Sequence, residues 1–302
     1  MMITIDMERG LDQPGSFLHK NANTSANNHS ALIPSCVAGV MGREAKDFYT
    51  LDLRESVTST NTLVKEASDS FRGEGLVIGA THQSAGRGRL GRTFHSPQGS
   101  GLYFSVLLRP RSDIADAVFI TTTAAVAMCR AINEAFDADV KIKWVNDLYK
   151  GSKKVCGILT EGVWTEDGKS LSAVVLGIGV NICPPRQGFP RDIAQIADAV
   201  FAQTDECGTN EKASVLLGAF LDIFLTLYKH TPQEQIAELY RSMNLTVGKR
   251  ITVIKGGSEK PRQAVALDID SRCRLKVQYT DTLETELLSS GEISIRHGEQ
   301  ND

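Results

Sequence analysis

The chain has 302 residues, and 41% of them are hydrophobic, which suffices for one large domain or a large and a small one. Its formal net charge of −3 argues against binding of nucleic acid or membranes through overall charge. The six cysteines form no CxxC pair and no cluster with histidine, so we expect no zinc site and reduced thiols in the cytoplasm. We expect no signal peptide and no membrane span.

Residues 1–46 differ in composition from the rest. The stretch from Asn21 to Ser30 is polar and aperiodic, so we predict a disordered tail over 1–46. It shows no pair of amphipathic helices around a tight turn, so we expect no DNA-binding helix-turn-helix.

Periodicity predicts the elements between residues 47 and 246. Ser59-Thr60-Asn61 caps a helix over 62–67, and buried strands follow over 75–80 and 101–108. A helix over 114–136 leads to a strand over 140–144, and then to two strands, 155–163 and 171–180, joined by a turn at 166–169. Further helices are expected over 192–202, 211–228 and 232–243.

The pattern changes near Val247. Five short strands separated by Gly, Asp and Ser turns predict a small all-β barrel over 247–298. Their ranges are 250–254, 262–268, 275–279, 284–288 and 293–296.

The segment Gly86-Arg87-Gly88-Arg89-Leu90-Gly91-Arg92 is the most informative in the chain. Glycines let a backbone turn sharply and approach a ligand, and arginines bring forked donors for phosphate or carboxylate. The loop matches neither the P-loop nor the dinucleotide-binding fingerprint. It predicts an anion-binding loop; a solvated basic loop, such as an RNA-binding arm, is the alternative.

Three later segments also carry polar groups. Lys143-Trp144-Val145-Asn146-Asp147 ends a strand, Lys154 to Glu161 opens one with a lysine, and Gly177 to Asn181 alternates glycines. Taken alone, the first segment also fits an ordinary turn after a strand, the second an exposed charge at a strand edge, and the third a bulge.

Taken together and in order, these segments resemble the biotin protein ligases. That family carries Gly-Arg-Gly-Arg-x-Gly-Arg, Ser-Pro-x-Gly-x-x-Leu-Tyr, Lys-Trp-Pro-Asn-Asp, Lys-x-x-Gly-Ile-Leu-x-Glu and Gly-x-Gly-x-Asn. The chain matches these at 86–92, 96–103, 143–147, 154–161 and 177–181, and the likeness runs from about Ser59 to Arg296. The resemblance implies an α+β fold: a class II synthetase-like mixed β-sheet flanked by helices over 47–246, and a small SH3-like barrel at the carboxyl end.

The resemblance also implies roles for individual residues. Ser59, Thr60, Asn61 and Gln83 would hold the ureido ring of biotin. Arg87, Arg89 and Lys154 would act on the biotin carboxylate and the adenylate phosphate, and are the implied catalytic residues. Asn146 and Asp147 would contact ATP, with Asp147 holding Mg²⁺. The remaining implied ligand contacts are Gly86, Gly88, Arg92, Phe94, Lys143, Gly157, Gly179, Asn181, Glu292 and Arg296.

The chain departs from the family pattern twice. Phe94 stands where the family has a tryptophan, and Val145 stands where it has a proline. Phenylalanine can still stack but loses the indole N–H, and valine lacks the fixed backbone angle of proline.

The implied enzyme activates biotin with ATP and Mg²⁺ to biotinyl-5′-AMP and transfers it to a lysine of a biotin carboxyl carrier protein. We expect a monofunctional ligase that binds neither DNA nor membranes, with a loop over 85–94 that orders on ligand binding. A homodimer is compatible with an exposed sheet edge. The alternatives are a lipoate or octanoyl ligase, a bifunctional ligase and repressor, and a non-catalytic biotin-binding module.

Overall fold

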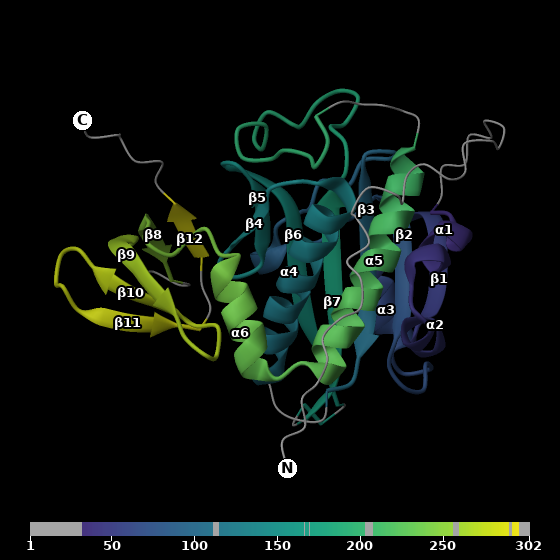
Figure 1. Cartoon of the computed structure of the whole chain (residues 1–302), viewed down its shortest axis with the longest axis horizontal. Helices are drawn as coiled ribbons and strands as arrows, with labels where there is room; N and C mark the ends of the chain where they lie inside the picture. The colour runs from purple at the N-terminus through teal and green to yellow at the C-terminus, as the bar shows by residue number, and fades with distance from the viewer. Residues whose placement is uncertain are drawn as a thin grey trace, which may run out of the picture.

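The structure is a computed structural model, and it describes residues 32–110, 115–165, 167–168, 170–202, 208–255, 260–289 and 292–295. Two separate sheets organise these residues (Figure 1). A seven-stranded sheet has the order β1-β2-β3-β7-β6-β5-β4, and a five-stranded sheet has the order β11-β10-β9-β8-β12.

The large sheet is mixed. Only β1 and β2 run parallel; the other neighbouring strands are antiparallel. Its strands are β1 (Thr50–Val57), β2 (Leu76–Gln83), β3 (Gly101–Leu108), β4 (Val140–Lys143), β5 (Asp147–Lys150), β6 (Lys153–Trp164) and β7 (Leu171–Asn181). The predicted mixed sheet flanked by helices is therefore confirmed.

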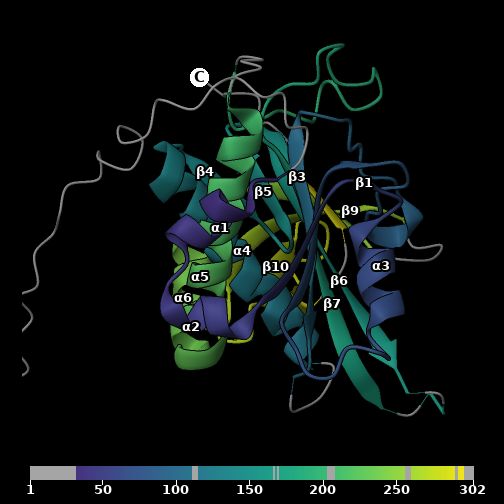
Figure 2. The same cartoon turned by 90° about the vertical axis from the view of Figure 1, so that its right-hand side faces the viewer.

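Helices cover both faces of this sheet, as Figure 2 shows. On one face lies α3 (Thr60–Ala67), which packs through Val64 on the odd-numbered residues of β7. On the other lie α4 (Ala115–Phe136) and α5 (Thr209–His230). Successive side chains of a strand point to opposite faces of the sheet. An apolar run such as 102–108 therefore contributes to the buried clusters on both faces.

Helix α5 is long and apolar enough to span a membrane by length and composition. Much of it is buried in the fold, however, where Phe220 stacks on Phe224 and packs edge-to-face against Phe104. We therefore assign it to the core of this domain.

Two sequence predictions are wrong. Residues 34–48 are not a disordered tail: they form α1 (Pro34–Val40) and α2 (Arg43–Phe48), which lie against α5. Val37 is fully buried there, and Gly42 N donates to Asp222 Oδ1 at 2.7 Å. Residues 1–31 of the predicted tail lie outside the described residues.

The predicted helix over 192–202 is a series of turns. Backbone pairing takes precedence over its helical spacing: Lys154 N donates to Ile196 O at 2.8 Å and Val200 N to Asn181 O at 2.9 Å. These bonds join the segment to the ends of β6 and β7.

The small sheet contains β8 (Arg250–Ile254), β9 (Arg262–Ile269), β10 (Leu275–Tyr279), β11 (Thr285–Leu288) and β12 (Glu292–Ile295). All five predicted strands are confirmed. Helix α6 (Gln233–Ser242) lies between this sheet and the large one (Figure 1), and Arg241 donates to Ile269 O.

Candidate functional site

The register of the large sheet brings the predicted motifs into one row. Lys143 pairs with Asp147, Asp147 with Gly157, Gly157 with Gly179, and Gly179 with Tyr103. Because paired residues share a face of the sheet, segments up to 76 residues apart in sequence meet on the α3 side.

A hydrogen-bonded polar cluster forms where α3 begins. Ser59 caps the helix, with its Oγ accepting from Thr62 N at 3.5 Å. Thr60 donates to Gln83 Oε1 through its backbone N at 2.9 Å, and its hydroxyl lies 3.2 Å from the same oxygen. Gln83 Nε2 in turn donates to Ser96 Oγ at 3.1 Å. The structure thus brings the predicted ureido-binding residues Ser59, Thr60 and Gln83 together.

Asn61 extends this network beneath the sheet. Its Oδ1 accepts from the fully buried Ser105 at 2.6 Å, and its Nδ2 donates to Glu161 Oε2 at 2.8 Å. Gly177 leaves the space for it, because a Cβ there would lie 1.8 Å from Asn61 Oδ1. A glycine is therefore needed at 177 as long as Asn61 keeps this position.

The Gly/Arg loop folds back on itself. Phe94 N donates to Gly86 O at 3.0 Å and Gly88 N to Arg92 O at 2.7 Å, around a short 3-10 turn, η1 (Arg89–Gly91). A Cβ at Gly86 would lie 2.4 Å from Phe94 O, so the two arms approach more closely than any side chain allows. The loop's glycines serve its own turn as well as any ligand.

Each of the three predicted catalytic cations contacts a polar group of β5, of β6 or of the turn before β5. Arg87 Nη2 lies 3.0 Å from Glu161 Oε1, and Lys154 Nζ lies 2.7 Å from Asp147 Oδ1. Arg89 Nη1 donates to Asn146 Oδ1 at 3.0 Å. Positive charge from a loop and from a strand therefore lies at or beside the glycine row.

Phe94 lies over the two glycines of that row. A Cβ at Gly179 would lie 2.7 Å from its ring, and one at Gly157 would lie 3.1 Å away. Lys154 Nζ is 5.8 Å from the ring centroid, within the range of a cation–π contact. Gly157 and Gly179 thus accept a flat ring, and here the ring is the chain's own.

The turn that presents Asn146 and Asp147 is held from three sides. Tyr240 OH of α6 donates to Val145 O at 2.9 Å, Trp144 N donates to Thr246 Oγ1 at 3.0 Å, and Trp144 Nε1 donates to Cys273 O of the small sheet at 2.9 Å. The Trp144–Val145 peptide bond is cis. Neighbouring elements therefore position this turn without the proline that the family carries there.

Two predicted residues have side chains bonded outside this cluster. Lys143 stands in the row beside Asp147, but its Nζ donates to Tyr149 OH at 3.2 Å, and Asn181 Nδ2 donates to Asp198 O at 2.8 Å. Arg92 is exposed near the end of the loop. Glu292 opens β12 beside Ile254, and Arg296 lies outside the described residues.

The sequence predictions did not include three polar residues that join the network: Ser96, Ser105 and Glu161. Ser105 is a polar residue in the otherwise apolar strand 102–108, and Glu161 ends a quoted motif four residues after Gly157. Even spacing on a strand puts Glu161 on the face of Gly157, and this spacing could have identified it.

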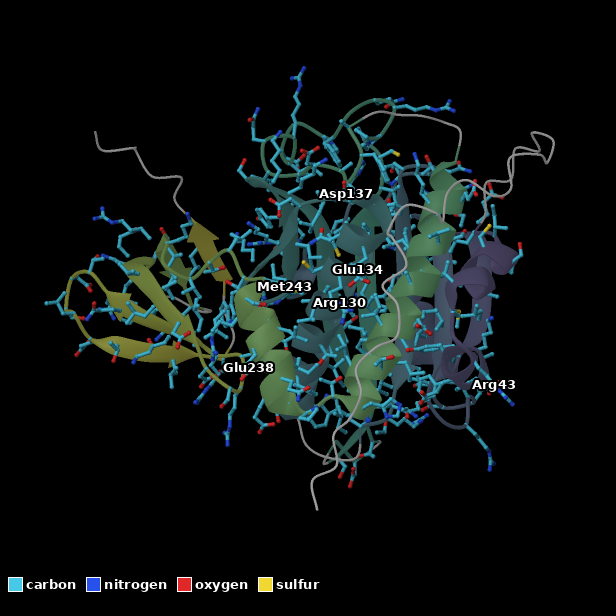
Figure 3. All side chains as sticks on the ribbon, in the orientation of Figure 1. Arg43, Arg130, Glu134, Asp137, Glu238 and Met243 are labelled. Atoms are coloured by element: carbon cyan, nitrogen blue, oxygen red, sulfur yellow. The ribbon has the colours of Figure 1, made fainter. Side chains whose placement is uncertain are left out.

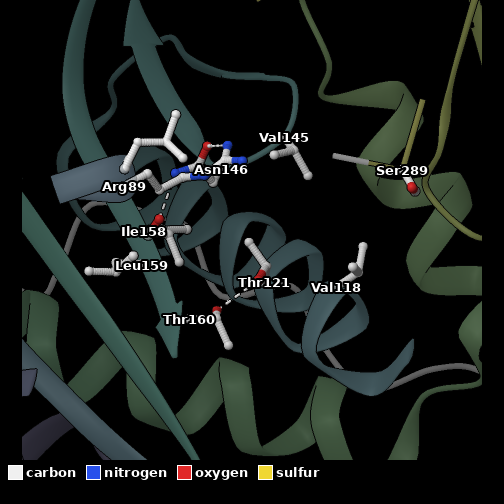
Figure 4. A pocket seen from close by; sticks show the side chains of 10 residues that line it. Arg89, Val118, Thr121, Val145, Asn146, Ile158, Leu159, Thr160 and Ser289 are labelled. Atoms are coloured by element: carbon white, nitrogen blue, oxygen red, sulfur yellow. Dashed lines mark hydrogen bonds between the residues drawn. The ribbon is translucent and has the colours of Figure 1, made fainter. Parts of the chain in front are cut away.

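A cavity of about 340 Å³ opens on the α4 side of the sheet (Figure 4). Arg89 and Asn146 lie at its edge, Thr121 Oγ1 is 2.7 Å from Thr160 Oγ1 within it, and Ser289 comes from the small sheet. Arg89 and Asn146 thus lie between the glycine row and this cavity.

Among the described residues, no group of three or more His, Cys, Asp or Glu side chains could hold a metal ion. The cysteines within them are all free.

Comparison with known proteins agrees with this geometry. Residues 53–181 match the biotin/lipoate A/B protein ligase family. A bifunctional ligase/repressor BirA of Bacillus spizizenii is 34% identical over 153 residues, 51% of this chain and 46% of that protein. A biotin–[acetyl-CoA-carboxylase] ligase of Mycobacterium tuberculosis is 28% identical over 249 residues, 80% of this chain and 88% of that protein.

The fold comparison gives the same class. A biotin protein ligase from Aquifex aeolicus in complex with biotin and ATP has a TM-score of 0.64 and 24% identity, covering 82% of this chain and 99% of that one. Its identity is low enough that it shows the fold alone.

Residues 53–181 therefore form a domain of the biotin/lipoate A/B protein ligase family. A second biotin–[acetyl-CoA-carboxylase] ligase, from Paracoccus denitrificans, is 36% identical over 126 residues, 41% of this chain and 51% of that protein. The aligned region spans about half the length of the Bacillus relatives, 46% and 44%.

Proposed function

We propose that the chain is an ATP-dependent ligase that joins biotin to a specific lysine of the biotin carboxyl carrier protein of acetyl-CoA carboxylase or a related carboxylase. One observation carries the proposal: Lys154 lies at the glycine row, Arg87 and Arg89 contact residues of β6 and of the turn beside that row, and the Thr60–Gln83 polar cluster lies next to them. Neutral polar groups next to cationic side chains suit a ligand with a ureido ring at one end and a carboxylate at the other.

In the first step an oxygen of the biotin carboxylate attacks the α-phosphorus of ATP. A P–O bond forms to the carboxylate, and the bond to the β-phosphate breaks, which releases pyrophosphate. Two anions must meet, so Lys154, Arg87 and Arg89 offset their repulsion and the charge that develops at phosphorus.

In the second step the amine of an acceptor lysine attacks the carbonyl carbon of biotinyl-5′-AMP. An amide forms, AMP leaves, and the amine loses a proton. Water competes for the same carbonyl, so the folded loop from Gly86 to Phe94 would shield the adenylate between the steps.

Mg²⁺ would be held by Asp147, together with phosphate oxygens of ATP, and would supply charge neutralisation. A single carboxylate fits such a site, because Mg²⁺ is commonly bound through one or two carboxylates plus substrate phosphates. Asp147 contacts Lys154 here, so it would exchange that partner for the ion.

The separate five-stranded antiparallel sheet supports our division of the chain into a ligand-binding domain over 47–246 and an SH3-like barrel over 247–298. The bulge in β10 beside Lys276–Val277 supports strand curvature of that kind. In this division Glu292 and Arg296 would approach the nucleotide from the barrel.

We further propose that residues 32–48 serve the ligase domain and not DNA, although the Bacillus relatives are named ligase/repressors. Helices α1 and α2 are bound to α5 through Val37 and Asp222, which leaves them as part of its core. We expect a cytoplasmic enzyme that acts without DNA or membranes, and a gel-shift assay on random-sequence DNA checks the first point.

The decisive experiment incubates the purified chain with biotin, ATP, Mg²⁺ and a biotin carboxyl carrier domain. The intact mass of the carrier should rise by one biotinyl group, and pyrophosphate should appear before the carrier is added. Replacing biotin by lipoate is the control. Transfer of lipoate but not biotin would refute the proposed substrate.

A further inference from the structure

Glu161 stands between the Gly/Arg loop and the polar cluster. Its Oε1 lies 3.0 Å from Arg87 Nη2 in the loop, and its Oε2 accepts from Asn61 Nδ2 in the cluster at 2.8 Å. The same carboxylate therefore contacts both parts of the site with different oxygens.

The cluster side of this link is rigid. Asn61 is 6% exposed and Ser105 is fully buried, and Ser105 Oγ lies within 2.8 Å of both Asn61 Oδ1 and Thr60 Oγ1. Thr60 in turn donates to Gln83 Oε1 through its backbone N, which leaves its hydroxyl to donate to Ser105 Oγ. A continuous chain of hydrogen bonds thus runs from Gln83 to Glu161 across three strands and a helix.

The loop side is more open. The Arg87 side chain is 49% exposed, whereas that of Glu161 is 22% exposed. An ion pair with one exposed partner adds little to global stability. Its consequence is local, because it attaches the first part of the Gly/Arg loop to β6.

We propose that Glu161 is a positioning residue that couples the Gly/Arg loop to the buried polar cluster of Asn61, Thr60 and Gln83. Asn61 holds Glu161 in place, and Glu161 then holds Arg87 over the ligand's anionic end. This inference rests on the proposed function for the identity of the ligand, but the coupling itself belongs to the protein alone.

The test uses Glu161→Gln. Glutamine keeps an oxygen that can accept from Asn61 and removes the charge that attracts Arg87. Backbone amide exchange of residues 86–93 in the ligand-free protein should rise severalfold, and the Kd for biotin should rise about tenfold, as expected for loss of one charge-assisted hydrogen bond. The melting temperature should stay close to that of the wild type.

The matched control is Glu134→Gln. Glu134 pairs with Arg130 at 2.9 Å on α4, the helix on the other side of the sheet from α3 (Figure 3). This change also breaks an ion pair, and it should alter neither loop exchange nor biotin binding.

A double-mutant cycle with Arg87→Gln distinguishes coupling from a general packing effect. If Glu161 acts through Arg87, then Glu161→Gln should change loop exchange less than about twofold in the Arg87→Gln background. Equal effects in both backgrounds would overturn the proposal. So would wild-type loop exchange and biotin affinity in Glu161→Gln.

If Glu161→Gln fails to fold, Arg87→Gln alone decides the proposal. Its loop exchange must rise at an unchanged melting temperature, and unchanged exchange overturns the coupling. Release of pyrophosphate by the wild type in the presence of biotin and ATP tests the proposed function separately. Its absence would refute the ligase assignment while the loop measurement still stands.

Discussion

Lys154 is the residue whose loss should affect chemistry most. Its Nζ is the cation nearest the glycine row, and its side chain is 31% exposed, so it contributes little to the core. For Lys154→Ala we expect adenylate formation to fall by two or more orders of magnitude, since removing one group that stabilises the transition state typically costs about 10²–10³ in kcat.

The neighbouring Lys153→Ala is the matched control for that experiment. Lys153 Nζ donates to Ala194 O at 3.3 Å, away from Asp147. Its pyrophosphate release should stay near that of the wild type. A Lys154→Ala enzyme that released pyrophosphate as fast as Lys153→Ala would contradict the assigned role.

Gly177 should tolerate no side chain while Asn61 is present. Because a Cβ would overlap Asn61 Oδ1, Gly177→Ala should lower the free energy of unfolding by about 1–3 kcal/mol and weaken biotin binding. In an Asn61→Ala background the same change should cost less than about 0.5 kcal/mol. Urea unfolding of the four proteins measures this, and an equal cost in both backgrounds would refute the explanation.

At this scale the motifs identified several residues that the fold brings together: the Gly/Arg loop, Thr60, Gln83 and Lys154. Their roles toward a ligand stay predictions. Glu161 and Ser105 were missed because their partners, Arg87 and Asn61, lie 74 and 44 residues away and meet them only through the sheet register. Asn181 was predicted to contact the ligand, and in the structure its side-chain Nδ2 donates to the backbone oxygen of Asp198.

At the scale of elements, the turn carrying Asn146 depends on α6. Tyr240 is fully buried, and its hydroxyl is bonded to Val145 O. Tyr240→Phe leaves that carbonyl without its side-chain donor, which should cost about 1–3 kcal/mol of stability. We expect a higher KM for ATP and an unchanged Kd for biotin, because Asn146 moves and the Thr60–Gln83 polar cluster does not.

Tyr228→Phe is the comparison for that variant. Tyr228 on α5 stacks on Phe224 and donates to Glu74 Oε2 at 3.4 Å, far along the chain from the turn. Steady-state kinetics with each substrate in turn should show no change in KM for ATP. A similar rise in both variants would mean that Tyr240 acts through general stability.

Element prediction from sequence succeeded where one periodicity dominates, as in α4 and β3. It failed at 192–202. The side chains of this segment have helical spacing, but its backbone pairs with the ends of two strands through Ile196 and Val200. It also failed at 34–48, where two helices of seven and six residues are too short to show a clear period and depend on α5 for burial.

At the scale of the whole molecule, the small sheet is attached to the large domain through residues that serve the site. Trp144 Nε1 donates to Cys273 O, and Cys273 is 3% exposed. The thiol of Cys273 therefore reports whether the small sheet stays in place. Cys129, Cys156 and Cys183 are buried in the large domain, whereas Cys36 is partly exposed.

Burial also controls the chemistry of these thiols. It raises the pKa of Cys129 from 9.0 to about 12, and it raises the pKa of Cys156 and Cys273 as well. Because the folded state holds these protons more tightly than the unfolded chain does, this contribution to stability is complete below pH 9 and is lost as pH rises toward 12. Thiolate, the reactive form, is thus scarce in the folded protein at pH 8.

We therefore expect that, at pH 8, a thiol reagent labels Cys36 rapidly and labels Cys129, Cys156, Cys183 and Cys273 only as the protein unfolds. Cys207 lies outside the described residues and is replaced by serine for the measurement. Mass spectrometry of peptides over time gives each rate, and guanidinium chloride, which should bring all five to similar rates, is the control. Rapid labelling of Cys273 alone would show that the small sheet detaches from Trp144, and the turn at Asn146 would then lose one of its three supports without ligand or denaturant.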